Sequence, residues 1–160
     1  LALPQVGFNF VRPGLAVYGL SPIGGRFGLK PILSLKSRMT MIKEIRKGRP
    51  LSYDSLFRVP RRMRVGTIAA GYADGYDIRL TNKSDVLIHG KRCRQLGRVT
   101  MDEIIVDLTR VPEARWGDTV TLIGEEGREA ITAHELAKRA GTIPWEILTS
   151  ISKRVERVYV

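Results

Sequence analysis

Beyond residue 32, apolar and polar residues alternate along much of the chain with the period of two that is typical of β-strands. In the segment 33–45, LSLKSRMTMIKEI, positions 33, 35, 37, 39 and 41 share one face, with Lys and Arg among the residues between them. The pattern predicts further strands at 65–70, 85–97, 102–109, 116–124 and 154–160. The second of these is predicted to be a hairpin that turns at residues 89–91.

Two helices are predicted near the end of the chain. Thr132 and Glu135 have the spacing of a capping box, apolar residues follow at helical intervals, and Gly141 suits a C-terminal cap. Pro144 suits the first position of a second short helix over 144–151. Between the strands, turn residues recur at intervals of about 8–12 residues, which is typical of a β-barrel or a β-sandwich. Residues 1–30 are dense in Gly and Pro, which predicts a strand end, a turn and a linker.

The composition fits one globular domain, since 160 residues with 43% hydrophobic content can bury a core but are short for two domains. No apolar run reaches about 18 residues and the start lacks a signal-peptide pattern, so no membrane segment is expected. Because the first residue is not Met, we expect a fragment of a longer protein. Cys93, the one cysteine, favours a reducing, cytoplasmic setting. Because the chain contains one cysteine and two histidines, no metal site is expected.

The net charge of +11 comes from 27 Lys and Arg against 16 Asp and Glu. Such an excess is compatible with a β-barrel module that binds nucleic acid or phosphate. A solvated basic surface, or a cut that removed acidic neighbours, is the favoured explanation, because the basic residues are spread along the chain. One local cluster contains Arg58, Arg61, Arg62 and Arg64.

Three motifs are candidates for binding. In VRPGLAVYGLSP, residues 11–22, Pro13 can hold Arg12 rigidly, and the N–H groups of Gly14 and Leu15 can form an anion-binding nest. The segments GYADGY, 71–76, and GRVTMDEIIVDLT, 97–109, contain turns that sequence alone explains by ordinary turn chemistry. Each motif is weak when taken separately.

Taken together and in this order, these motifs closely resemble the C-terminal part of bacterial alanine racemases, which are pyridoxal-phosphate enzymes. The resemblance extends through LSLKSRM, GRPLSY, IAAGYADGY, GDTVTLIG and AGTIPWEILTSISKRVERVYV. It implies a mainly β fold: a C-terminal β-barrel domain at 29–160 with one or two short helices. Residues 1–28 would be the last strand and turn of an α/β barrel that is otherwise absent from this chain.

The resemblance implies an isomerase that interconverts L- and D-alanine and supplies D-alanine for peptidoglycan. The cofactor, pyridoxal 5'-phosphate, would be bound covalently by a lysine outside this chain, because none of its eight lysines lies in a matching stretch: Lys30, Lys36, Lys43, Lys47, Lys83, Lys91, Lys138 and Lys153. That lysine is one of two catalytic bases, and Tyr53 matches the other. The tyrosine reaches its site across a homodimer in which each β domain covers the partner's barrel.

The resemblance also implies roles for other residues. Arg12 would donate to the cofactor's pyridine nitrogen, and the N–H groups of Gly14 and Leu15 would bind its phosphate. Met101 would bind the substrate carboxylate through its N–H. The corridor along which alanine enters would be lined by Tyr72, Arg98 and Ile143.

Two positions depart from the common pattern. Trp145 stands where a tyrosine commonly touches the cofactor phosphate, and Asp54-Ser55 replaces Gly-Ala after Tyr53. A carboxylate beside Tyr53 would oppose loss of its phenolic proton if it points that way. Because of these departures, a related amino-acid racemase of broader specificity is kept as an alternative function. The net charge keeps a less favoured alternative, a basic β-barrel binding module. We expect neither nucleic acid nor a membrane as a partner.

Overall fold

The computed structural model describes residues 9–23 and 27–160, and contacts divide the chain into two units, residues 1–33 and 34–160. In the first unit, the described residues form a 3-10 helix, η2 (Gly14–Tyr18), which ends at Gly19 in the left-handed conformation. Part of the segment expected to be the last barrel strand, residues 1–8, lies outside the described residues. The assignment of residues 1–28 to an α/β barrel therefore stays a prediction.

The second unit contains the strands and two α-helices. The strands are β1 (Leu35–Ile45), β2 (Pro50–Leu51), β3 (Phe57–Arg58), β4 (Met63–Ile68), β5 (Asp85–Ile88), β6 (Lys91–Leu96), β7 (Ile104–Asp107), β8 (Thr119–Glu126) and β9 (Glu129–Ile131). The helices are α1 (Ala133–Ala140) and α2 (Pro144–Thr149). Three short 3-10 helices lie in the loops: η3 (Tyr53–Ser55), η4 (Tyr72–Asp74) and η5 (Ile78–Leu80).

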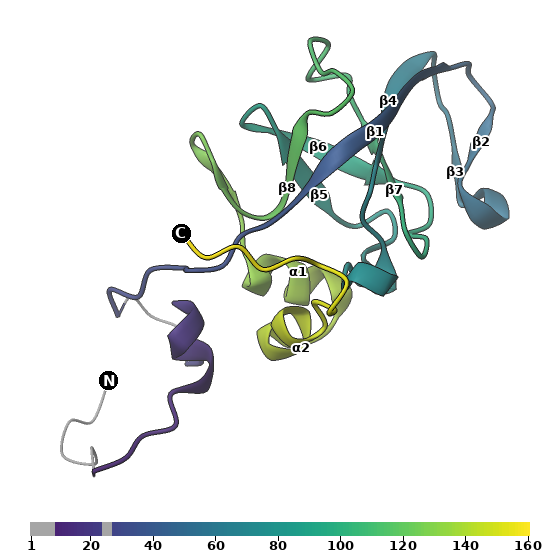
Figure 1. The fold of residues 1–160 in the computed structure, drawn as a ribbon. Helices are drawn as coiled ribbons and strands as arrows, with labels where there is room; N and C mark the ends of the chain where they lie inside the picture. Colours follow the sequence, from purple (N-terminus) through teal and green to yellow (C-terminus); the bar gives the residue numbers. More distant parts are fainter. Residues whose placement is uncertain (1–8, 24–26) are drawn as a thin grey trace. The chain divides into compact units, whose positions relative to one another are not determined.

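Six of the strands close into a barrel. The sheet order is β1-β4-β7-β6-β5-β8-β9, and β1 also pairs with β8. The length of β1 permits this closure, because residues 35–38 pair with β8 and residues 39–45 pair with β4. Figure 1 shows β1 as the long strand that crosses from β8 to β4. The β-barrel expected from the sequence is confirmed.

The barrel encloses side chains that are almost fully buried, among them Ile68, Val86, Ile104, Val106, Val120 and Leu122. The alternation predicted for β1 breaks at one place. Met39 is 1% exposed, whereas Met41 is 41% exposed. The register between β1 and β4 shifts between these two residues, as in a β-bulge, and an extra residue in a strand turns the following side chains to the other face.

Helices α1 and α2 lie side by side near one end of the barrel (Figure 1). Thr132 caps α1 because its Oγ1 accepts a hydrogen bond from the N–H of Glu135 at 3.1 Å, and Gly141 ends the helix in the left-handed conformation. Pro144 is the first residue of α2. Both predicted helices are confirmed, and among the described residues no helix is long and apolar enough to span a bilayer.

The strand predicted at 154–160 is wrong. The alternation in RVERVYV is genuine, but no strand pairs with this segment in the described part of the chain. Instead, the guanidinium of Arg157 donates to the carbonyl oxygens of Ile151, Ser152 and Val155, which holds the backbone in a turn. Strand β9, which follows directly after β8, was not predicted.

Candidate active site

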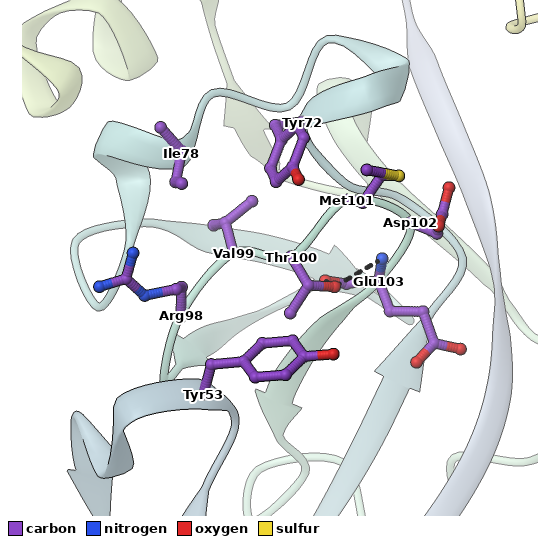
Figure 2. A pocket seen from close by; sticks show the side chains of 9 residues that line it. All are labelled: Tyr53, Tyr72, Ile78, Arg98, Val99, Thr100, Met101, Asp102 and Glu103. Atoms are coloured by element: carbon purple, nitrogen blue, oxygen red, sulfur yellow. Dashed lines mark hydrogen bonds between the residues drawn. The ribbon is translucent and has the colours of Figure 1, made fainter.

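Four of the residues predicted for the site line one open pocket of about 690 Å³. These are Tyr53, Tyr72, Arg98 and Met101. In Figure 2, the side chains of Tyr53 and Tyr72 lie on either side of the segment 98–103. Segments that are distant in sequence therefore meet around one cavity.

The GYADGY turn contributes Tyr72 to the lining of this pocket and is fixed by hydrogen bonds within the turn. Asp74 accepts from the N–H of Gly71 at 2.9 Å, so its carboxylate is used to shape the turn. Tyr76 points inward, is 2% exposed, and shares a 2.7 Å hydrogen bond with the hydroxyl of Ser84. Burial raises the pKa of Tyr76 well above the usual value for a phenol. Of the two tyrosines of the motif, Tyr72 therefore faces the pocket and Tyr76 belongs to the core.

Backbone hydrogen bonds join this turn to the segment that contains Met101. The N–H of Tyr72 donates to Thr100 O at 2.9 Å, and the N–H of Ala73 donates to Met101 O at 3.0 Å. Gly71 permits this approach, because a Cβ there would lie 2.2 Å from Met101 O. The positions of Tyr72 and Met101 are consequently coupled through the main chain.

Met101 lies at the corner of a tight turn between Thr100 and Glu103. The N–H of Glu103 donates to Thr100 Oγ1 (Figure 2), and the N–H and hydroxyl of Thr100 both donate to Glu103 O. These bonds occupy the ends of the turn. They present Met101, which is 52% exposed, on the pocket side.

Tyr53 lies at the tip of the hairpin formed by β2 and β3. The base of the hairpin is anchored in a small apolar cluster formed by Leu51, Val59, Met63, Val65 and Leu96, against which Phe57 packs. The tip itself projects from the cluster, and Tyr53 is 68% exposed. The hairpin thus holds an aromatic hydroxyl above the pocket on a short, well-anchored stem.

Asp54 points toward Arg98. Its Oδ2 lies 2.8 Å from Arg98 Nη2. Because the charge of this carboxylate is compensated by a guanidinium, it is not left unpaired beside Tyr53. Arg98 also accepts a hydrogen bond from the hydroxyl of Ser52 through its carbonyl oxygen, at 2.9 Å.

Ile143 and Trp145, at the start of α2, are 57% and 40% exposed and are not among the residues that line the pocket. Arg79, in η5, donates to Glu146 at 2.7 Å and so connects α2 to η5. Ile78, beside Arg79, does line the pocket. Ile78 was not predicted from the sequence, where the available signal was a lone apolar residue between Asp77 and Arg79 in a loop.

The predicted cofactor-binding residues Arg12, Gly14 and Leu15 lie in the N-terminal unit. Gly14 and Leu15 are the first residues of η2, and the first N–H that bonds along the helix is that of Ala16, to Pro13 O at 3.1 Å. Arg12 is exposed, whereas the Leu15 side chain is buried. The leading N–H groups of a helix, with an exposed arginine two residues before them in the sequence, are donors suited to an anion.

The titratable side chains in the described ranges include no group of three or more His, Cys, Asp and Glu that could hold a metal ion. Cys93 is buried, and desolvation raises the pKa of its thiol to about 12. The polar side chains that line the pocket are two phenols, one guanidinium, one hydroxyl and two carboxylates, those of Tyr53, Tyr72, Arg98, Thr100, Asp102 and Glu103.

Comparison with known proteins identifies the class of this domain. Residues 32–159 match the family described as alanine racemase, C-terminal domain. The chain is 46% identical over 157 residues to an alanine racemase of Geobacter sulfurreducens, which covers 95% of this chain and 41% of that protein. The chain thus belongs to the alanine racemase C-terminal domain family, and it spans about two fifths of the length of the relatives it matches.

Solved structures agree with this assignment. The alanine racemase of Streptomyces coelicolor A3(2) superposes with a TM-score of 0.92 at 38% identity, covering 99% of this chain and 42% of that one. The alanine racemase of Bartonella henselae, solved with covalently bound pyridoxal phosphate, superposes with a TM-score of 0.85 at 35% identity, covering 92% and 40%.

Proposed function

We propose that this chain is the C-terminal domain of an alanine racemase and that it completes an active site together with an α/β barrel. The observation that carries the proposal is the convergence of Tyr53, Tyr72, Arg98 and Met101 on one pocket of a chain from this family. The reaction removes the α-proton of alanine on one face and returns a proton on the other. It takes place in the cytoplasm and supplies D-alanine for peptidoglycan.

Tyr53 acts as the base on one face. Its phenolic oxygen takes the proton from one enantiomer and donates it to the other, while a lysine outside this chain acts on the opposite face. The exposed tip of the hairpin suits this role, because the phenol can enter a site formed by another surface. The Asp54 charge is compensated by Arg98, which removes the objection that an unpaired carboxylate would oppose loss of the phenolic proton.

Met101 and Tyr72 set the position and size of the substrate. The N–H of Met101 donates to the alanine carboxylate, and the Tyr72 ring narrows the space around the small side chain. Arg98 and Ile143 line the corridor further out. The main-chain hydrogen bonds between the Tyr72 turn and Thr100–Met101 support this division of roles. They hold the N–H of Met101 and the ring of Tyr72 at fixed positions relative to each other.

Pyridoxal 5'-phosphate, when bound, supplies the sink for the electrons that remain after the α-proton leaves. The donors of the N-terminal unit fit this group: the N–H groups of Gly14 and Leu15 would hold its phosphate, and Arg12 would donate to its pyridine nitrogen. Since a guanidinium cannot give up a proton here, Arg12 leaves the ring a weaker sink, which favours simple racemisation. Trp145 would add an indole N–H near the phosphate.

The active protein is a homodimer in which the β domain of one subunit covers the barrel of the other. The exposure of Tyr53 (68%), Tyr72 (43%) and Met101 (52%) supports this arrangement. Aromatic and apolar side chains gathered at an open pocket are typical of surfaces that another protein surface covers. Domain closure across the dimer would exclude water from the reacting atoms.

A chimaera tests the proposal. We would replace the matching part of the Geobacter sulfurreducens relative with this chain, add pyridoxal 5'-phosphate, and measure conversion of L- to D-alanine. We expect activity that Tyr53→Phe abolishes while the Phe variant still folds and dimerises. A folded, dimeric and cofactor-loaded chimaera without activity would contradict the proposed function.

The same chimaera decides between alanine and a broader specificity. Trp145, bulkier than the tyrosine common at its position, is the feature that favours the alternative racemase. We expect a preference for alanine over serine and lysine, whereas preference for a basic amino acid would overturn the alanine assignment.

A further inference from the structure

The backbone around Tyr53 adopts conformations that side chains disfavour. Three residues of the tip have positive φ without being glycine: Ser52 at 60°, Asp54 at 59° and Ser55 at 51°. Ser52 combines this φ with a ψ of −174°, a region that belongs almost entirely to glycine. Such a backbone persists only where its surroundings hold it in place.

One residue holds both neighbours of Tyr53. Arg98 accepts a hydrogen bond from the Ser52 hydroxyl through its carbonyl oxygen at 2.9 Å, and its Nη2 lies 2.8 Å from Asp54 Oδ2. The contact is close because Gly97 precedes Arg98: a Cβ there would lie 2.8 Å from the Cβ of Ser52. We call these three residues, Ser52, Asp54 and Arg98, the Tyr53 clamp.

The clamp is poorly suited to a role in global stability. The side chains of Asp54 and Arg98 are 60% and 38% exposed, and exposed ion pairs contribute little to unfolding free energy. The base of the hairpin is already anchored by its apolar cluster. In addition, Arg98 buries its Nε, which has no hydrogen-bond partner in the part of the chain that the structure describes. An arginine serving as a surface charge has no reason to bury a donor in this way.

We propose that Arg98 is a positioning residue for the catalytic tyrosine: it clamps Ser52 and Asp54, and thereby fixes the direction in which Tyr53 leaves the hairpin. This inference rests on the proposed function, because Tyr53 needs a fixed direction only if it transfers a proton. It differs from the corridor role of Arg98, which concerns the passage of substrate. Asp54 acquires a purpose here, since it supplies the carboxylate half of the clamp.

The first test uses the 160-residue chain and needs no activity. Chymotrypsin cleaves after aromatic and large apolar residues, and mass spectrometry can follow cuts between residues 53 and 57. We expect Ser52→Ala combined with Asp54→Asn to accelerate these cuts about tenfold, as a mobile tip is a better protease substrate. Arg62→Gln, which breaks an exposed ion pair with Glu44 elsewhere, is the matched control and should not change them. Equal rates in all three proteins, with equal thermal stability, would overturn the clamp.

The second test measures turnover in the chimaera. Asp54→Asn and Arg98→Gln should each lower kcat about three- to tenfold with little change in KM, and the double variant should be no worse than the poorer single one. Arg98→Lys should recover part of the loss. If the losses of kcat in the two single variants multiply in the double variant, or if only KM changes, the positioning role is overturned. If the unmodified chimaera is inactive, the proposed function fails, and proteolysis of the chain still decides whether the clamp exists.

Discussion

The buried Tyr76–Ser84 pair provides a test of the core that does not depend on the catalytic proposal. Tyr76→Phe removes the phenolic hydroxyl and preserves the ring. Ser84 then keeps Leu80 O, at 3.4 Å, as an acceptor for its own hydroxyl. The loss is one neutral hydrogen bond, so we expect unfolding free energy to fall by about 1 kcal/mol at pH 8.

Removing the other partner of this hydrogen bond should lower the unfolding free energy further. Ser84→Ala leaves the Tyr76 hydroxyl without this partner in a position where the residue is 2% exposed. An unsatisfied buried hydroxyl costs about 1–3 kcal/mol. The double variant should therefore be less destabilised than the sum of the single variants, with a coupling of about 1 kcal/mol.

The raised pKa of Tyr76 predicts how the stability difference between the unmodified protein and Tyr76→Phe changes with pH. Burial raises the pKa of Tyr76 in the folded protein above that of the unfolded chain, so the stabilising contribution is complete below about pH 10 and is lost as the pH rises further. Between pH 9 and 11, the unfolded phenol ionises while the folded one does not, which costs the unmodified protein about 1.4 kcal/mol. Tyr76→Phe lacks this penalty, so its disadvantage at pH 8 should disappear near pH 11.

Urea unfolding at pH 8, 9 and 11 measures these differences. Tyr159→Phe makes the same chemical change at a residue that is 92% exposed, and should leave stability unchanged at all three values. A deficit of Tyr76→Phe that stays constant from pH 9 to 11 would refute the argument, because it would mean that the phenol ionises equally in both states.

Three other predictions concern single residues: two follow from a contact and one from burial. Gly71→Ala places a Cβ 2.2 Å from Met101 O, so the steric clash should cost about 2 kcal/mol and lower Tm by about 4–8 °C; an unchanged Tm would contradict the close approach. Thr132→Ala removes the cap that accepts from the N–H of Glu135, and differential scanning calorimetry should show a loss of about 1 kcal/mol, with Thr132→Ser as the tolerated control. Cys93, with its thiol pKa raised from 9.0 to about 12, should hold roughly a thousandfold less thiolate than an exposed cysteine and react with a disulfide reagent only after denaturation.

Local patterns predicted those elements that local interactions determine. The capping box at Thr132, the left-handed Gly141 and Pro144 specify both helices within a few residues. The 85–97 hairpin was predicted for the same reason, because β5 and β6 are neighbours in sequence as well as in the sheet.

Elements that depend on distant partners were less predictable. Alternation in 154–160 indicates a strand, but a strand needs a neighbour, and the Arg157 guanidinium supplies the backbone with other bonds. Met41 was expected on the same face as Met39, and a bulge that depends on pairing with β4 turns it outward. Neither partner is visible from the segment itself.

The candidate site shows the same limit. Turn chemistry alone gave no reason to join Tyr53, Tyr72 and Met101; resemblance to a family predicted that they belong together, and the barrel brings them to one pocket. Their individual roles remain predictions. The pairing of Asp54 with Arg98 could not be foreseen, because it depends on the strained conformation of the hairpin tip.

The closure of the barrel by β1 has a consequence for how the chain folds during synthesis. Residues 35–38 of β1 pair with residues 119–123 of β8, so β1 cannot complete its pairing until β8 has been synthesised. Until β8 has left the ribosome, β1 and β5 each present an unpaired edge to other nascent chains. Substitutions that weaken the β1–β8 seam should therefore reduce the yield of soluble protein at high expression rates, even where the finished barrel tolerates them.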